Sequence, residues 1–243
     1  MERFFLELDG KRVSYLKGGK GETLLFLHGL WVDSSGYIDL LKELSKEFTV
    51  YALDLPGFGK SFIPDNIYSY EDYAGIIQSF LRKLTIKKTY LLGHSMGGGM
   101  AVVFSSLYPR YVKKLILINS IGMQEKLPIF TLYGAMALRS LTTLFSPGKL
   151  IKYDHFFKSF FLNLFRSPLY IFKATHVHKD DNLEKYATKI TSNTLLLWSD
   201  HDEFFPLIQG RKLHRLIPKS KLHIIKGTHD WCIFNPRELR RII

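Results

Sequence analysis

The chain has 243 residues, of which 46% are hydrophobic, and its 34 Lys and Arg against 22 Asp and Glu give a formal net charge of +12. This length and composition exclude a disordered chain and suit one large α/β domain, with or without an insertion. The charge would suit acidic partners, but no zinc-finger, recognition-helix or aromatic RNA-binding signature is present. We therefore expect no nucleic-acid partner, and peripheral contact with an anionic membrane or an acidic carrier protein stays open.

The cysteine content and the first residues bear on location. The single cysteine, Cys232, cannot form an internal disulfide, so nothing indicates an oxidising compartment. Residues 1–9 hold acidic side chains where an export signal would need an apolar segment. We expect a cytoplasmic protein.

Strands and helices alternate through the first half of the chain. Residues 3–8 and 11–16 predict a hairpin that turns at Asp9-Gly10. Apolar runs then predict buried strands and spaced apolar residues predict helices. The strands are 24–27, 48–53, the run that begins at Thr89, and 114–119. The helices are a segment capped by Ser34-Ser35, with apolar residues at 38, 41, 44 and 48, then 69–83 and 96–108. This order predicts a mostly parallel sheet with helices on both faces.

The alternation stops between about residues 121 and 190. This segment has a helical pattern and many phenylalanines, so we expect an inserted helical cap with an apolar acyl or aromatic pocket. Within it, Leu127–Phe145 is interpreted as a helix over the pocket, with a membrane-surface helix as the alternative. Strands at 194–198 and 221–225 and helices at 206–216 and from Pro236 follow. The predicted core is therefore 1–120 and 191–243, with the cap at 121–190.

The most informative stretch is Gly93-His94-Ser95-Met96-Gly97, where a buried strand ends and a helix begins. Glycines on both sides of a serine allow the strand and helix to pass close together, and the strained turn lifts the hydroxyl out of the sheet. Gly59-Lys60-Ser61 suggests a phosphate-binding loop, but that motif needs a glycine where Asp54 stands. A nucleophilic serine is therefore the better hypothesis.

A serine nucleophile needs a histidine base and a carboxylate that fixes the tautomer of the base. The segment that follows the penultimate predicted strand holds Asp200 and Asp202, and His229 follows the last one. The order Ser, Asp, His is the one expected when a nucleophile elbow precedes both loops. The backbone N–H of Met96, at the start of the elbow helix, is expected to stabilise an oxyanion.

Together with His28-Gly29 and Asp54–Ser61, these motifs make the whole chain except the cap resemble the serine α/β-hydrolases of the small esterase and lipase type. The resemblance implies Asp202 rather than Asp200 as the acid, since Pro206 lies four residues further on, although Ser199 stands where the family pattern has glycine. It also implies that the Leu30 N–H is the second oxyanion donor. Trp31, His94 and Trp231 are tentative substrate-binding residues, and His94 is interpreted chiefly as packing in the elbow.

The resemblance implies a hydrolase that cleaves carboxylic esters with short to medium acyl or aromatic groups. Four alternatives stay open: an acylglycerol or lysophospholipid lipase at membranes, an esterase or thioesterase for acyl-carrier substrates, a ligand receptor with little turnover, and a carbon–carbon bond hydrolase or perhydrolase. No dinucleotide fingerprint or metal-ligand spacing is present, so we expect neither a cofactor nor a metal.

Overall fold

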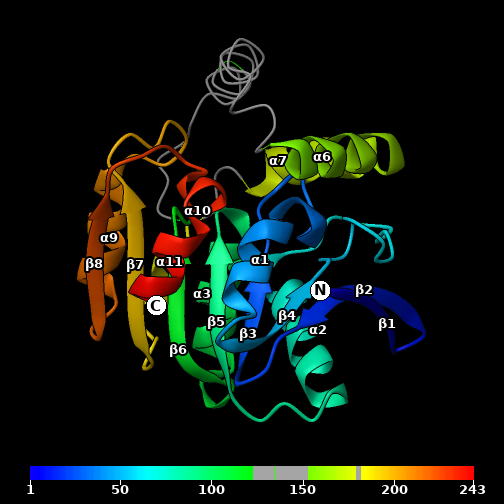
Figure 1. The fold of residues 1–243 in the computed structure, drawn as a ribbon, viewed down its shortest axis with the longest axis horizontal. Coiled ribbons are helices and arrows are strands. Elements are labelled where there is room, and N and C mark those ends of the chain that lie inside the picture. Colours follow the sequence, from blue (N-terminus) through cyan, green and yellow to red (C-terminus); the bar gives the residue numbers. More distant parts are fainter. Residues whose placement is uncertain (123–133, 135–152, 179–181) are drawn as a thin grey trace.

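In a computed structural model of the chain, residues 1–122, 134, 153–178 and 182–243 are described. Their centre is an eight-stranded sheet in the order β1-β2-β4-β3-β5-β6-β7-β8 (Figure 1). The hairpin β1–β2 joins β4 antiparallel, and the strands from β4 to β8 are parallel. The strands are β1 (Glu2–Leu8), β2 (Lys11–Gly18), β3 (Glu22–Leu27), β4 (Phe48–Leu53), β5 (Thr89–His94), β6 (Val112–Ile118), β7 (Asn193–Ser199) and β8 (Ser220–Ile225).

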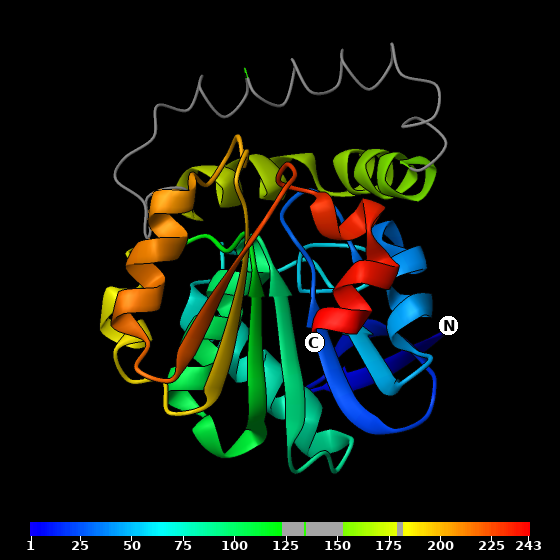
Figure 2. The same ribbon diagram turned by 60° about the vertical axis from the view of Figure 1, so that its left-hand side comes forward.

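Helices cover both faces of this sheet (Figure 2). The described helices of the core are η1 (Ser34–Tyr37), α1 (Ile38–Leu44), α2 (Tyr70–Lys83), α3 (Met96–Leu107), η2 (Pro109–Tyr111), α9 (Leu207–Leu216), α10 (Trp231–Phe234) and α11 (Pro236–Ile242). The predicted α/β-hydrolase architecture, a mostly parallel sheet flanked by helices with a helical insertion, is confirmed.

The buried strands divide their side chains between two cores. In β3, Leu24 and Phe26 pack with α1 and α11, whereas Leu25 and Leu27 pack with α2, α3 and α9. Successive side chains of a strand point to opposite faces, so a strand covered on both sides has to be apolar throughout. That requirement explains the uninterrupted Leu24–Leu27 run.

Local details differ from the sequence prediction in three places. Asp33, rather than Ser34 or Ser35, caps the first helical turn, because its side chain accepts the N–H of Ser35 at 2.7 Å. Phe48 opens β4 instead of completing the preceding helix. The short helix α10 follows the histidine loop and is too brief for periodicity to detect.

The described part of the inserted segment consists of α6 (Asp154–Arg166), α7 (Pro168–His178) and the one-turn α8 (Glu184–Ala187). Figures 1 and 2 place α6 and α7 across the carboxyl ends of the strands. The predicted helix at Leu127–Phe145 lies outside the described residues, apart from position 134. Among the helices that are described, none is long and apolar enough to cross a bilayer.

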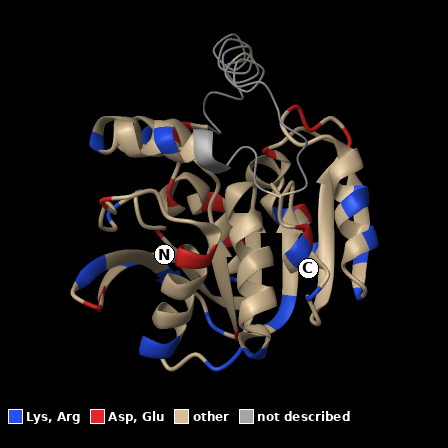
Figure 3. Cartoon of the chain, turned by 180° about the vertical axis from the view of Figure 1, so that it is seen from behind, with Lys and Arg blue, Asp and Glu red and all other residues tan. Residues whose placement is uncertain are grey.

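Charged residues are distributed over many elements of the described chain. Figure 3 shows basic segments on the helices, on the hairpin and along the lower loops, with acidic segments between them. Several of these charges are paired on the surface, for example Lys158 with Asp154 at 2.7 Å and Lys212 with Glu184. Seen from this side, the positive charges are dispersed, not gathered into one basic face.

Candidate active site

Ser95 occupies the sharp turn between β5 and α3. Its backbone has φ 56° and ψ −122°, a region that non-glycine residues rarely adopt. The turn is held by its own backbone, since the Ser95 N–H donates to the carbonyl of Ile118 at 3.0 Å and the Ser95 carbonyl accepts the N–H groups of Gly98 and Ile121 at 2.9 and 3.1 Å. The strained geometry is therefore fixed by the strand beside it.

The flanking glycines are required by close backbone contacts. A Cβ on Gly93 would lie 2.4 Å from the carbonyl oxygen of Gly97, and one on Gly97 would lie 2.3 Å from that of Leu27. No real side chain tolerates such distances, so strand and helix approach closely only with glycine at both positions. This contact explains the Gly-x-Ser-x-Gly spacing.

Asp202 and His229 meet at the same edge of the sheet. The Asp202 Oδ2 lies 2.9 Å from the His229 Nδ1, and the other carboxylate oxygen accepts the N–H groups of Phe204 and Phe205 at 2.9 and 2.8 Å. Asp202 and His229 are each 6% exposed. A buried carboxylate held by two backbone donors has a fixed position and orients the imidazole.

Asp200, the other candidate for the acid, has a different role. Its carboxylate accepts the N–H of Gly227 at 3.0 Å and lies 2.7 Å from the Nδ1 of the exposed His201. These hydrogen bonds, first that from Gly227 and then that from His201, lower the pKa of the Asp200 carboxyl group. Asp200 therefore ties the two loops together, and Asp202 is the residue that reaches His229.

Three residues that the sequence analysis did not single out hold the histidine loop. The His229 N–H donates to Glu203 Oε2 at 3.1 Å, and the His229 carbonyl accepts Nδ2 of Asn119 at 2.7 Å. Asn119, at the end of β6 with φ 44°, also bonds the Oγ and N–H of Ser199. A polar residue directly after a buried strand next to the elbow was the available signal for Asn119.

The third such residue is Tyr37, which acts together with His94. Its hydroxyl lies 2.7 Å from His94 Nδ1, and His94 Nε2 lies 3.0 Å from the carbonyl of His229. Both ring nitrogens of His94 therefore have protein partners, and the residue is only 2% exposed. These contacts support its interpretation as elbow packing, and its place among the substrate-binding residues stays a prediction.

The loop after β3 carries the expected oxyanion donor Leu30. His28, fully buried, fixes this loop, because its Nδ1 lies 2.8 Å from the Gly29 carbonyl and its Nε2 accepts the Leu55 N–H at 3.0 Å. Burial, which outweighs the opposing hydrogen bond to Gly29, lowers the pKa of His28. Gly29, the residue before Leu30, lies close to Ser95, since a Cβ on Gly29 would be 3.3 Å from the Ser95 Cβ, and Met96 opens α3.

The tentative pocket residues Trp31 and Trp231 lie in different places. Trp31 has φ 73° and stacks on Phe160 of α6 at 5.5 Å between ring centroids, with Phe172 of α7 edge-on at 5.3 Å. It therefore joins the oxyanion loop to the inserted helices. Trp231 is buried in the core on the α1 and α11 face, against Gly227, so its packing is structural and its substrate role stays a prediction.

The phenylalanines of α6 divide between two environments. Phe160 packs on Trp31, as an apolar pocket would require, but Phe161 and Phe165 are 50% and 83% exposed. The side chains that α6 buries are polar, namely Ser159 and Asn163. The exposed Phe161 and Phe165 therefore do not line a pocket, and the expected apolar acyl or aromatic pocket stays a prediction.

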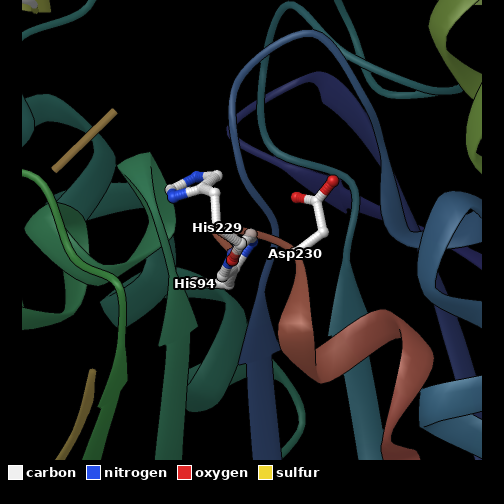
Figure 4. A group of neighbouring side chains, drawn as sticks. All are labelled: His94, His229 and Asp230. Atoms are coloured by element: carbon white, nitrogen blue, oxygen red, sulfur yellow. The ribbon is translucent and has the colours of Figure 1, made fainter. Parts of the chain in front are cut away.

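His94, His229 and Asp230 form a cluster whose possible ligand atoms lie within 4.8 Å of one another. Figure 4 shows that the His229 and Asp230 side chains diverge from the backbone they share. Both nitrogens of His94 and the Nδ1 of His229 already have protein partners, and Asp230 accepts the Tyr153 hydroxyl at 3.2 Å. A metal ion would have to break these hydrogen bonds. These residues therefore fit the surroundings of the proposed triad better than a metal site.

Comparison with known proteins supports the fold described above. The family described as "alpha/beta hydrolase fold" matches residues 22–139. A 2-hydroxy-6-oxononadienedioate/2-hydroxy-6-oxononatrienedioate hydrolase of Escherichia coli K12 is 29% identical over 90% of this chain and 85% of its own length. Among solved structures, a membrane phospholipase A (24% identity, 99% and 84% coverage, TM-score 0.80) and a thermophilic esterase from Thermogutta terrifontis (20% identity, 100% and 96% coverage, TM-score 0.80) share the fold.

Proposed function

Because this chain belongs to the serine α/β-hydrolase superfamily, we propose that it hydrolyses carboxylic esters through an acyl-enzyme on Ser95. The observation that carries the proposal is the buried 2.9 Å contact between Asp202 and His229, at the same sheet edge as a serine held in a strained turn. A superfamily fold alone hosts many reactions, so the proposed activity rests on this arrangement of side chains.

The proposed reaction has two halves. His229 takes the proton of the Ser95 hydroxyl through Nε2, because its Nδ1 is held by Asp202. The Ser95 Oγ then attacks the ester carbonyl carbon, and the N–H groups of Leu30 and Met96 stabilise the oxyanion. The imidazolium returns its proton to the departing alcohol, which leaves an acyl-enzyme. Water, deprotonated by His229, releases the acid and restores the serine.

The test is a series of p-nitrophenyl esters of increasing acyl length, with the Ser95→Ala protein as the blank. The wild-type protein is expected to hydrolyse many ester molecules per active site. The Ser95→Ala protein, which has no nucleophile, is expected to show only the background rate of hydrolysis. Equal rates for the two proteins would refute the proposal. A single slow cycle of acyl release would favour the receptor alternative.

Hydrolysis of a carbon–carbon bond is the second candidate, and the Escherichia coli relative favours it. The named compound, a hydroxy-oxo-dienedioate, contains no ester, so its hydrolysis has to cleave carbon from carbon. The same serine, base and oxyanion donors serve such a reaction when a ketone is the electrophile. A vinylogous keto acid offered beside the ester series separates the two candidates, because one substrate class should dominate kcat/KM.

An ester embedded in a lipid surface is a narrower form of the first candidate. The outward phenylalanines of α6 and the exposed Leu169 and Phe172 of α7 support it, and Phe172 also contacts Trp31 in the oxyanion loop. Lys158, which also pairs with Asp154 at 2.7 Å, and Lys173 are exposed cations on the same helices that an anionic lipid would require. Activity on short esters with and without anionic vesicles tests this form.

A further inference from the structure

A hydrogen-bonded chain crosses the site from the oxyanion loop to the histidine loop. The Gly29 N–H lies 3.2 Å from the hydroxyl of Tyr37, which lies 2.7 Å from His94 Nδ1, and His94 Nε2 lies 3.0 Å from the His229 carbonyl. Tyr37 and His94 are 1% and 2% exposed. This series of hydrogen bonds therefore joins the oxyanion loop, the serine elbow and the histidine loop through buried groups.

The two ends of this chain fix the direction of every hydrogen bond in it. A backbone N–H can only donate and a backbone carbonyl can only accept. With a neutral imidazole, Tyr37 accepts from Gly29 and donates to Nδ1 of His94, and Nε2 of His94 donates to His229. His94 is thereby held in a single tautomer and a single ring orientation.

Packing makes the chain rigid as well as connected. The Tyr37 ring meets the rings of Phe26 at 4.8 Å and of His94 at 5.6 Å, and the His94 ring lies 4.8 Å from that of His229. A Cβ placed on Gly29 would lie 3.1 Å from the Tyr37 hydroxyl, 3.3 Å from Ser95 Cβ and 3.5 Å from His94 Nδ1. We call the hydrogen-bonded pair of Tyr37 and His94 the brace. The oxyanion loop, the elbow and the brace are therefore in direct contact.

We propose that Tyr37 and His94 are positioning residues that set the distance between the oxyanion donors and the base His229. This inference rests on the proposed function, because it assigns the brace to the same Ser95 reaction. The serine must meet the base while the substrate oxygen meets the N–H groups, so the two loops have to be placed to within a fraction of an ångström. A misplacement of about 1 Å can cost on the order of 100-fold in rate.

The experiment compares Tyr37→Phe, His94→Leu, His94→Gln and the Tyr37→Phe/His94→Leu double variant in ester hydrolysis. Tyr37→Phe and His94→Leu are each expected to lower kcat on the order of 10- to 100-fold with little change in KM. His94→Gln keeps an N–H near the position of Nε2 and is expected to recover part of the loss. The double variant is expected to lose no more than the worse single variant, since one broken link already disables the chain.

Tyr73→Phe is the matched control, because Tyr73 is equally buried and its hydroxyl bonds Tyr170 and Pro56 instead. It is expected to lower Tm as Tyr37→Phe does while kcat stays within about twofold of wild type. Variants of Tyr37 and His94 that match the control in kcat would overturn the proposal. A loss confined to KM would also overturn it, since His94 would then contact substrate.

A second readout separates this proposal from the hydrolytic one. The Nδ1 proton of His229, bonded to Asp202, gives a low-field proton resonance that Asp202→Asn removes and so assigns. Tyr37→Phe and His94→Leu are expected to speed exchange of that proton with water, and Tyr73→Phe is not. If wild type hydrolyses no ester, the proposed function fails, and unchanged exchange in the brace variants refutes the brace separately.

Discussion

Helices α3 and α6 distribute their side chains in opposite ways. Helix α3, which leaves the serine elbow, buries apolar residues such as Met100, Val103 and Phe104 against the sheet. Helix α6 buries Ser159 and Asn163 and leaves Phe161 and Phe165 in solvent. Apolar burial is non-directional, so it fixes α3 by shape, whereas α6 is held by hydrogen bonds that specify individual partners.

Those partners form a polar latch between α6 and two core loops. Asn163 Nδ2 donates to Asp33 Oδ2 at 2.9 Å, its Oδ1 accepts the Gly59 N–H at 2.6 Å, and Ser159 Oγ accepts the Asp33 N–H at 2.8 Å. Arg166 adds hydrogen bonds to the carbonyls of Gly59 and Ser61. The proposed nucleophile therefore precedes a helix that the apolar core holds, whereas the inserted helix α6 is attached by a small set of directed contacts.

The largest effect on kcat is expected in the core of the molecule, at Asp202, the proposed acid of the triad. Asp202→Asn keeps the shape of the side chain but cannot fix the tautomer of His229, so kcat should fall about 10,000-fold. Asp200→Asn is the matched control and should leave kcat within a few fold, because Asp200 bonds Gly227 and His201 instead. Steady-state kinetics of both proteins measure this. A larger loss for the Asp200 variant would move the acid role to that residue.

The next largest effect is expected from a variant that breaks the polar latch. Asn163→Ala removes the partner of the buried Asp33 Oδ2 and of the Gly59 N–H, so the free energy of unfolding should fall by about 2–3 kcal/mol. Asn193→Ala, at an exposed position in β7, should change it by less than about 0.5 kcal/mol. Urea denaturation of the two variants measures the difference. Equal values would mean that apolar contacts alone hold α6.

The core and its site could be predicted because each depends on a local pattern. Uninterrupted apolar runs located the parallel strands. Ser95 directly follows β5, and Asp202 and His229 lie three and four residues after the ends of β7 and β8, where the ends of parallel strands meet. The brace through Tyr37 and His94 could not be predicted, since its contacts join positions 57 and 135 residues apart.

The orientation of α6 could not be predicted for a different reason. Hydrophobic periodicity assigns the apolar face of a helix to the interior, and its phenylalanines therefore indicated a pocket. The structure turns Asn163 inward because the buried carboxylate of Asp33 and the N–H of Gly59 need partners there. Periodicity carries no information about polar groups that another segment leaves unpaired.

A smaller effect concerns pH and the core loop that His28 fixes. Burial lowers the pKa of His28 below its ordinary 6.5, so the unfolded chain binds a proton more readily than the folded one. Stability from His28 is therefore complete above about pH 6.5 and declines as the pH falls toward the folded pKa. The Tm of wild type should drop more steeply from about pH 7.5 to 5.5 than that of His28→Gln, which lacks the titrating group. Parallel slopes would show that other groups set the acid sensitivity.

The smallest effect is expected on the outward face of α6. Phe165 is 83% exposed, so Phe165→Ser should change the free energy of unfolding by less than about 0.5 kcal/mol, whereas Phe104→Ser in α3 should cost about 3–5 kcal/mol. Paired urea denaturation curves measure both. A cost above about 1 kcal/mol at Phe165 would mean that this side chain is covered in the folded protein and that the two helices differ less than their contacts indicate. With a small cost, the same variant also tests the lipid-surface candidate, because hydrolysis of short soluble esters should be unchanged while hydrolysis of esters in anionic vesicles should fall, as binding scales with the apolar area inserted.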